Sequence, residues 1–155
     1  MELELVLVGK PAGGGLTEAY KEMVSRMRRP WVVRERIIPS AGQGGPDHKR
    51  RVEEERILRA IQAGAPIVVL DEGGRTMTSS AFANDLGRWR DQGTRRIVFV
   101  VGGAFGLTDT VRERADLLLS FGPMTFPHQL VRLMLAEQLY RAQEILRGSA
   151  YHHGE

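Results

Sequence analysis

Short apolar runs alternate with segments of helical character along the whole chain, and this alternation limits its fold more than any other feature. The apolar runs cover residues 3–8, 31–38, 66–71, 96–101 and 116–120. Helices are expected from about residue 17, from about 50 to 63, and over 79–91, 108–114 and 127–147. Strands separated by helices pair in parallel, with helices packed on both faces of the sheet. The sequence therefore predicts an α/β fold with a mostly parallel sheet.

Length and composition limit the class of protein. At 155 residues the chain fits one domain with a buried core, so we expect a single domain over residues 1–155. No run approaches the roughly 18 apolar residues of a membrane-spanning helix, and we expect a cytoplasmic protein with no membrane partner. Cysteine is absent, which excludes disulfides, a thiolate nucleophile and a zinc ribbon. We also expect no metal site.

The charge of the chain is a weak guide to its partner. The net charge is only +3, with 22 Lys and Arg residues against 19 Asp and Glu residues. Only three of the basic residues are lysines, and the planar arginine side chain suits phosphate contacts. A GC-rich genome or a warm habitat explains the arginine bias equally well. If the partner is RNA, we expect Arg132 and Arg141 near the site, with Arg50 and Arg51 as outlying phosphate contacts.

Two loops that follow strands form the candidate ligand site. Gly102, Gly103 and Gly106 come directly after an apolar run, so backbone amides can approach a ligand without a side chain in the way. Residues 121–126 follow the next apolar run and precede the last helix, whose first residues include His128, expected to cap or pack. Both loops are expected at the carboxyl ends of neighbouring strands, where open α/β sheets bind ligands. The glycines also fit a simple turn, and they match neither the dinucleotide-binding fingerprint nor a phosphate loop.

Five strings of the sequence carry a resemblance to a known family. They are VVLDEGG at 68–74, VVGGAFGL at 100–107, LSFGPMTFPHQLVR at 119–132, AEQLYRA at 136–142 and AYHH at 150–153. In this order and spacing the chain closely resembles the SPOUT methyltransferases, and among them the ribosomal RNA large subunit methyltransferase H family, over its full length. The tail departs from the pattern, because His153 stands where some relatives have a basic residue and is followed by Gly154 and Glu155.

The resemblance implies a fold and a cofactor. Members of the family carry a deep trefoil knot in the C-terminal third of the chain, and its loops form a pocket for S-adenosylmethionine. By resemblance, this pocket is assigned to Leu70, to the turn at Gly102 and Gly103, and to the loop after the last strand. That loop consists of Phe121, Gly122, Pro123, Met124, Thr125 and Phe126. Leu70 and Phe126 also fit ordinary core positions.

The last helix and the residues after it carry the candidate catalytic side chains. Glu137 and Arg141 are four residues apart on the expected helix, and Tyr151 and His152 belong to a tail, 151–155, that we expect to be functional. Histidine exchanges a proton near neutral pH, so His152 is the candidate base, and Arg141 would stabilise the negative charge that develops on the substrate. Tyr151 would stack on an extruded base. A surface ion pair and a tail that only positions the substrate are the alternatives.

The resemblance also implies a substrate and a partner. Family members methylate N3 of a pseudouridine in helix 69 of large-subunit ribosomal RNA, and we expect this chain to act on that RNA or on the assembled ribosome. The last helix is apolar around much of its circumference, which predicts a homodimer. In this dimer the tail of one subunit would complete the pocket of the other. A methyltransferase acting on transfer RNA and a noncatalytic RNA-binding or ribosome-assembly protein are the alternatives.

Overall fold

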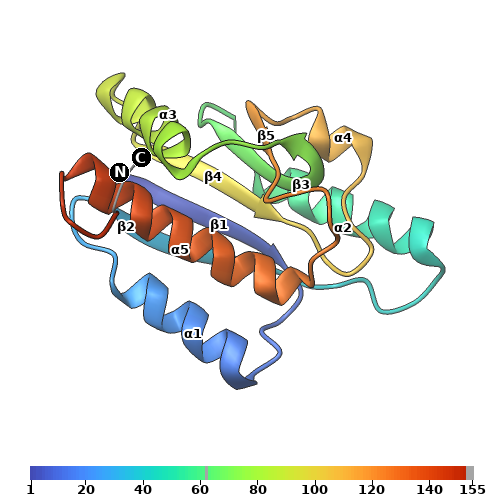
Figure 1. Ribbon diagram of the computed structural model, residues 1–155. Coiled ribbons are helices and arrows are strands. Elements are labelled where there is room, and N and C mark those ends of the chain that lie inside the picture. The colour runs from blue at the N-terminus through green and yellow to red at the C-terminus, as the bar shows by residue number, and fades with distance from the viewer. Residues whose placement is uncertain (62, 153–155) are drawn as a thin grey trace.

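The computed structural model describes residues 1–61 and 63–152 (Figure 1). Within these residues five strands alternate with five helices, as the sequence predicted. The strands are β1 (Glu2–Val8), β2 (Val32–Ile38), β3 (Ile67–Arg75), β4 (Arg96–Val101) and β5 (Leu117–Leu119). The helices are α1 (Gly14–Ser25), α2 (Pro46–Ala60), α3 (Ser79–Asp91), α4 (Asp109–Arg112) and α5 (His128–Leu146). No helix in this part of the chain is both long and apolar enough to cross a membrane.

The strands form one sheet in the order β2-β1-β4-β3-β5, and every pairing between them is parallel. All strands therefore end on the same side of the sheet, which we call the carboxyl edge (Val8, Val101 and Leu119). They start at the opposite side, the amino edge (Glu2 and Arg96). β3 lies between β4 and β5, so the strands that carry the two predicted loops are not the neighbours that were expected, but each is a neighbour of β3. The loops after these three strands leave the carboxyl edge together. The predicted parallel α/β sheet is confirmed.

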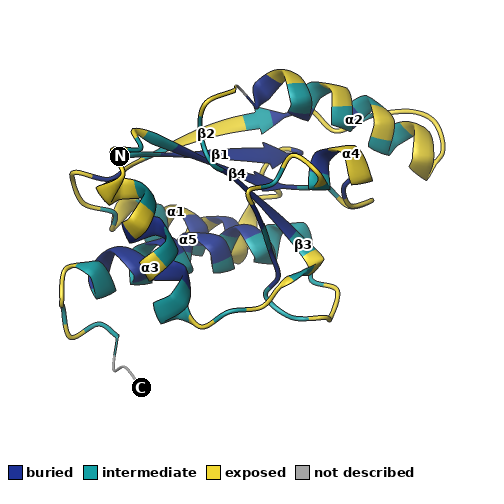
Figure 2. Cartoon of the chain, turned by 90° about the horizontal axis from the view of Figure 1, so that it is seen from above, coloured by how far each residue is buried: buried dark blue, intermediate teal, exposed yellow. Residues whose placement is uncertain are grey.

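Helices cover both faces of the sheet, which buries β1 and β4 almost completely, whereas most of the outer strand β2 stays exposed (Figure 2). Side chains alternate across a strand, so Leu3, Leu5 and Leu7 point to the face that α1, α3 and α5 cover. Val6 and Val8 point to the other face, where α2 and α4 pack. Both sets of side chains of β1 are therefore buried. Parallel sheets are normally buried on both faces, and this one follows that rule.

Four helices differ from their predicted bounds, α4 and α5 by one or two residues at each end and α1 and α2 by more. α1 begins three residues earlier than expected, so Gly14 and Gly15 lie in its first turn instead of in a flexible connection. α2 begins at Pro46, four residues before its expected start. It ends three residues earlier than expected, because Ile61 adopts an extended conformation with ψ of 103°. The differences in α1 and α2 arise at positions where glycine or a backbone turn decides the boundary, and apolar periodicity carries little information there.

The pairing of β3 with β5 positions the loop that follows β5. β3 continues beyond its predicted end at residue 71, and both Leu70 and Arg75 pair with Leu119, with a register shift between them. Gly74 of β3 lies directly against the backbone of β5. A Cβ atom on Gly74 would be 2.7 Å from the Leu118 carbonyl oxygen and 2.8 Å from the Leu119 carbonyl carbon. β5 has only three residues, so this close approach sets where the loop begins.

We predict that Gly74→Ala lowers the free energy of unfolding by about 1–3 kcal/mol, because the backbone of β5 cannot move aside cheaply. Gly15→Ala is the matched control, since nothing lies within 4 Å of its added Cβ and alanine favours a helix. This control should be neutral or stabilising by up to about 1 kcal/mol. Urea unfolding of the two variants measures the difference, and equal stabilities would contradict the close contact between Gly74 and the backbone of β5.

Candidate active site

The loops after β3, β4 and β5 enclose a cavity of about 800 Å³ at the carboxyl edge, and the start of α5 closes its remaining side. This volume is typical of sites for small molecules and cofactors. Eight of the candidate cofactor residues line the cavity, namely Leu70, Gly102, Gly103, Phe121, Gly122, Met124, Thr125 and Phe126. Pro123 of the same loop is exposed and lies outside this lining. The structure thus brings the two predicted loops to one place.

Glycines shape the turn after β4. Gly106 has a φ of 75°, a conformation that favours glycine, and a bridge joins Gly103 to Gly106. A Cβ atom on Gly102 would lie 2.9 Å from Leu107 Cγ, and one on Gly103 would lie 3.0 Å from Val8 Cγ1. Both positions therefore face side chains of the core. Glycine lets the turn pack tightly against them while its backbone lines the cavity.

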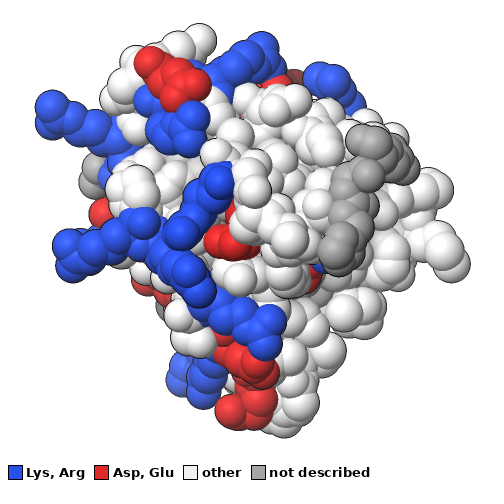
Figure 3. Space-filling view, turned by 60° about the vertical axis from the view of Figure 1, so that its left-hand side comes forward, with Lys and Arg blue, Asp and Glu red and all other residues white. Residues whose placement is uncertain are grey.

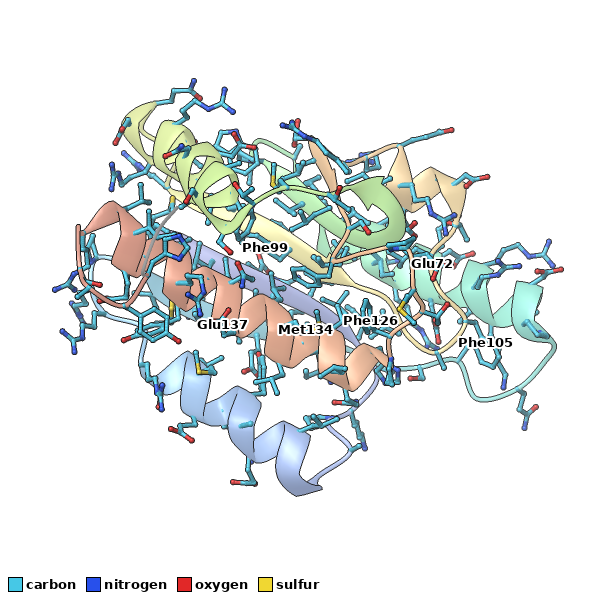
Figure 4. The ribbon with its side chains drawn as sticks, in the orientation of Figure 1. Glu72, Phe99, Phe105, Phe126, Met134 and Glu137 are labelled. Carbon is cyan, nitrogen blue, oxygen red and sulfur yellow. The ribbon has the colours of Figure 1, made fainter. Side chains whose placement is uncertain are left out.

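Two carboxylates at the rim of the cavity were missed by the sequence interpretation. Asp71 accepts a hydrogen bond from Arg112 Nε at 2.8 Å, and Glu72 accepts one from the Thr125 hydroxyl at 2.9 Å. Figure 4 shows Glu72 and Phe126 at the same end of the molecule, and both line the cavity. Their position directly after the buried part of β3 was the available signal, because residues that follow parallel strands face the binding edge.

His128 begins α5 and lines the cavity. Burial lowers the pKa of its imidazole, the charge of Arg132 lowers it further, and the charge of Glu53 acts in the opposite direction. With its pKa below the ordinary value, the side chain is neutral at pH 7. His128 therefore contributes a neutral ring to the wall of the cavity.

Arg132 was expected to contact RNA, and this expectation is wrong. Its side chain is 3% exposed, and Nη2 donates hydrogen bonds to the carbonyl oxygens of Val8 at 2.6 Å and Gly9 at 2.8 Å. These bonds fasten α5 to the end of β1. The residue type alone did not predict the burial of Arg132, because the direction in which an arginine on a helix points depends on how the helix packs.

The four candidate catalytic residues meet beyond the middle of α5. Arg141 Nε donates to Glu137 Oε1 at 2.9 Å, and the Tyr151 hydroxyl donates to the same oxygen at 3.3 Å. The Arg141 guanidinium lies 4.9 Å from the centroid of the Tyr151 ring, and its Nη1 lies 3.4 Å from His152 Nδ1. We call these four residues the tail cluster. The remainder of the predicted tail, residues 153–155, lies outside the described residues.

Charges inside the tail cluster leave one group suited to proton transfer. The hydrogen bond to Glu137 raises the pKa of Arg141, so the guanidinium stays charged. Burial raises the pKa of Tyr151, and the negative charge of Glu137 raises it further, so the phenol stays protonated. His152 is the remaining side chain of the tail cluster. Its Nε2 lies 3.4 Å from the Ser80 hydroxyl of α3.

The tail cluster and the cavity lie apart within one chain. Val131 lines the cavity, whereas Arg141 is ten residues further along the same helix. An α-helix rises 1.5 Å per residue, so about 15 Å separates these positions. None of the four cluster residues lines the cavity. One chain therefore does not bring the candidate catalytic residues to the candidate cofactor loops.

An open apolar groove of about 540 Å³ lies between the cavity and the tail cluster. α1, α5 and the segment that leads into α3 form its walls, and its apolar side chains include Met23, Leu130, Leu133 and Met134. Figure 4 shows Met134 and Glu137 following one another along α5. Exposed apolar surface of this kind is typical of protein interfaces and of ligand-binding grooves.

The described residues contain no group of three His, Asp or Glu side chains placed to hold a metal ion. Residues 1–152 match the family described as predicted SPOUT methyltransferase. The chain is 47% identical over 152 residues to the ribosomal RNA large subunit methyltransferase H of Rhodospirillum centenum, covering 98% of this chain and 99% of the relative. The protein of the same name from Paramagnetospirillum magneticum is 46% identical with the same coverage. That from Methylobacterium nodulans is 43% identical over 163 residues and 99% of each chain.

The burial of Arg132 leads to a stability prediction. Arg132→Met keeps the length of the side chain but removes its hydrogen bonds to β1, so we expect the free energy of unfolding to fall by roughly 1.5–3 kcal/mol. Arg59→Ala is the control, because Arg59 is 78% exposed, and its effect should stay within about 0.5 kcal/mol. Thermal and urea unfolding measure both. If Arg132→Met is as stable as the parent protein, the bonds between α5 and β1 contribute nothing.

Proposed function

The chain belongs to the SPOUT methyltransferases, and from this premise we propose that it transfers the methyl group of S-adenosylmethionine to large-subunit ribosomal RNA. Identity of 43–47% over at least 98% of the chain to proteins named ribosomal RNA large subunit methyltransferase H carries this proposal. The proposed target is N3 of a pseudouridine in helix 69. A ribosomal substrate also accounts for the proposed cytoplasmic location.

The carboxyl-edge cavity fits the cofactor. Its walls combine the apolar side chains of Leu70 and Phe126 with the glycine backbone of the turn after β4, which suits an adenine ring with its edge on backbone groups. Glu72 places a carboxylate at the rim, and His128 is neutral there, so the cavity is compatible with a positively charged sulfonium. The cofactor supplies an activated methyl group. The residues of the chain therefore have to align the acceptor and remove its proton.

The tail cluster is suited to that second task. The N3 nitrogen of the base loses its proton as the new N–C bond forms, and in this proposal His152 takes that proton. The Arg141 guanidinium stabilises the negative charge that grows on the base, and Glu137 holds the guanidinium in position. Tyr151 offers a ring on which an extruded base stacks.

A homodimer resolves the separation of the two sites. The tail cluster of one subunit would lie at the cavity of the other if two chains packed across the apolar groove in opposite directions. An isologous contact of this kind produces two equivalent composite sites. The open groove and the distance along α5 support this arrangement. The two sites would then depend on assembly.

The knot and the domain boundary also belong to this proposal. We propose that the chain forms one SPOUT domain over residues 1–155, with 151–155 as its functional tail. The trefoil knot of the family would involve the last third of the chain. In support, α5 packs between α1 and α3, so the final helix is inserted between two helices that precede it.

We predict that the protein methylates assembled ribosomes and that mass spectrometry locates the new methyl group on the helix 69 pseudouridine. His152→Ala should lower the rate of methyl transfer by roughly 10²- to 10⁴-fold, the range for a lost acid-base or positioning group, while cofactor affinity measured by calorimetry stays unchanged. Ser80→Ala, which changes the neighbour of His152 Nε2 on α3, is the control and should retain most of the activity.

Other results of this experiment would replace the proposal. A methyl group found only on transfer RNA would identify a transfer RNA methyltransferase. Absence of cofactor binding would favour a noncatalytic RNA-binding or ribosome-assembly protein. If His152→Ala matches the parent rate across pH 6 to 9, His152 is not the base, and Arg141 with solvent as the proton acceptor becomes the better mechanism.

The composite site predicts complementation between two inactive variants. Gly102→Val disables the cavity, because its side chain meets Leu107, and His152→Ala disables the tail cluster. A heterodimer purified with two different tags should contain one intact composite site and recover about half of the parent activity. Homodimers of either variant are the controls. An inactive heterodimer would show that each chain uses its own tail cluster.

A further inference from the structure

Exposed arginines gather at the amino edge of the sheet, on the side opposite the cavity. The Met1 amino group donates to the Pro30 carbonyl at 2.8 Å, and the Glu2 amide donates to the Arg95 carbonyl at 2.8 Å. The first two residues of the chain are therefore held between the turn that contains Arg29 and the start of β4. Arg29 and Arg95 are both exposed, one on each side of β1.

The same turn is attached to the tail end of α5. The Gln143 side chain accepts a hydrogen bond from the Arg28 amide at 2.8 Å and donates one to the Arg28 carbonyl at 2.6 Å. Gln143 is 3% exposed and stands two residues after Arg141, so the amino edge and the tail cluster share one rigid support. The backbone of Arg28 is held, while its side chain is exposed.

Positive charge on this edge exceeds the nearby negative charge. Arg34 pairs with Glu2 at 2.7 Å, so that arginine is neutralised. By contrast, Arg28, Arg29 and Arg95 pair with no carboxylate among the described residues. Figure 3 shows lysine and arginine side chains over the left and upper parts of the view, with smaller acidic areas between them. We call Arg28, Arg29 and Arg95 the arginine edge.

A recess beside the arginine edge adds shape to the charge. It has a volume of about 640 Å³, and its lining includes Gly93, Thr94 and Arg95. Glu2 also lines the recess, but its carboxylate is paired with Arg34, so within the described part of the chain Arg95 supplies unpaired positive charge there for a hydrated anion. Guanidinium groups bind phosphate oxygens through paired hydrogen bonds, and phosphate contacts are the usual way in which a protein is positioned on a nucleic acid.

We propose that the arginine edge binds backbone phosphates of ribosomal RNA outside the nucleotide that is methylated. This inference rests on the proposed function, because the composite site places the tail cluster of one subunit at the cavity of its partner. Through Gln143, the arginine edge of the first subunit is attached to the tail cluster that would act on the base in the second subunit's cavity. Each active site thus receives its cofactor loops from one subunit and its outer RNA contacts from the other.

The test compares two double variants that each remove two positive charges. Arg29→Ala with Arg95→Ala changes the arginine edge, whereas Lys21→Ala with Arg59→Ala changes exposed side chains on α1 and α2. The first pair should weaken binding to ribosomes at least about tenfold at physiological salt and lower the slope of log affinity against log salt by about 1.5. The control pair should stay within about twofold of the parent. Cofactor affinity should be unchanged in both.

Three outcomes would overturn the inference. Equal ribosome affinity of the two double variants removes the arginine edge from the interface. Weaker binding to ribosomes with unchanged binding to protein-free large-subunit RNA assigns the contact to a ribosomal protein. Should the alanine pair misfold, Arg29→Lys with Arg95→Lys replaces it, and loss of the parent salt dependence in that charge-preserving variant would contradict a phosphate contact. A parent protein that binds ribosomes without methylating them instead refutes the proposed function.

Discussion

Burial of both faces of a parallel sheet is the constraint on which the rest of the structure depends. Helices must cover each face, so a ligand can reach the sheet itself only where its strands begin and end, at the amino edge and the carboxyl edge. At the carboxyl edge the short strand β5 and the glycine turn after β4 open a cavity between loops. At the amino edge the strand starts carry exposed arginines. The cavity and the arginine edge therefore lie at opposite edges of the sheet, and both result from the covering of its faces by helices.

Helix α5 runs from the cavity to the tail cluster and holds the two apart. Leu135 and Leu139 bury one side of the helix against the sheet, and Arg132 fastens its first half to the end of β1. A helix held in this way is rigid, so its start stays at the cavity and the tail cluster stays about 15 Å away. The apolar groove along the helix offers a surface for a second chain. Within one chain the length of α5 keeps the tail cluster away from the cavity. In the proposed dimer, the tail cluster of one chain would reach the cavity of the other.

The charged residues separate according to what surrounds them. Glu4 is 5% exposed and is neutralised by Arg36 at 3.0 Å and Arg96 at 3.5 Å from the two neighbouring strands. Arg132 serves backbone carbonyl groups in the core, whereas Arg95 at the amino edge is exposed. The sequence alone does not distinguish the buried charged residues from the exposed ones. Their burial, and therefore their role, depends on which strands become neighbours.

The sequence by itself determined the elements and the family. The bounds of α3 and β4 were predicted to the residue, because local apolar patterns specify them, and the loop strings identified the SPOUT methyltransferases. The convergence of two loops followed from parallel strand order. Only the tertiary structure decided the burial of Arg132, the carboxylates at the rim, and the separation of the tail cluster from the cavity. These depend on distances between segments remote in sequence, which are set by how α5 packs and which strands pair.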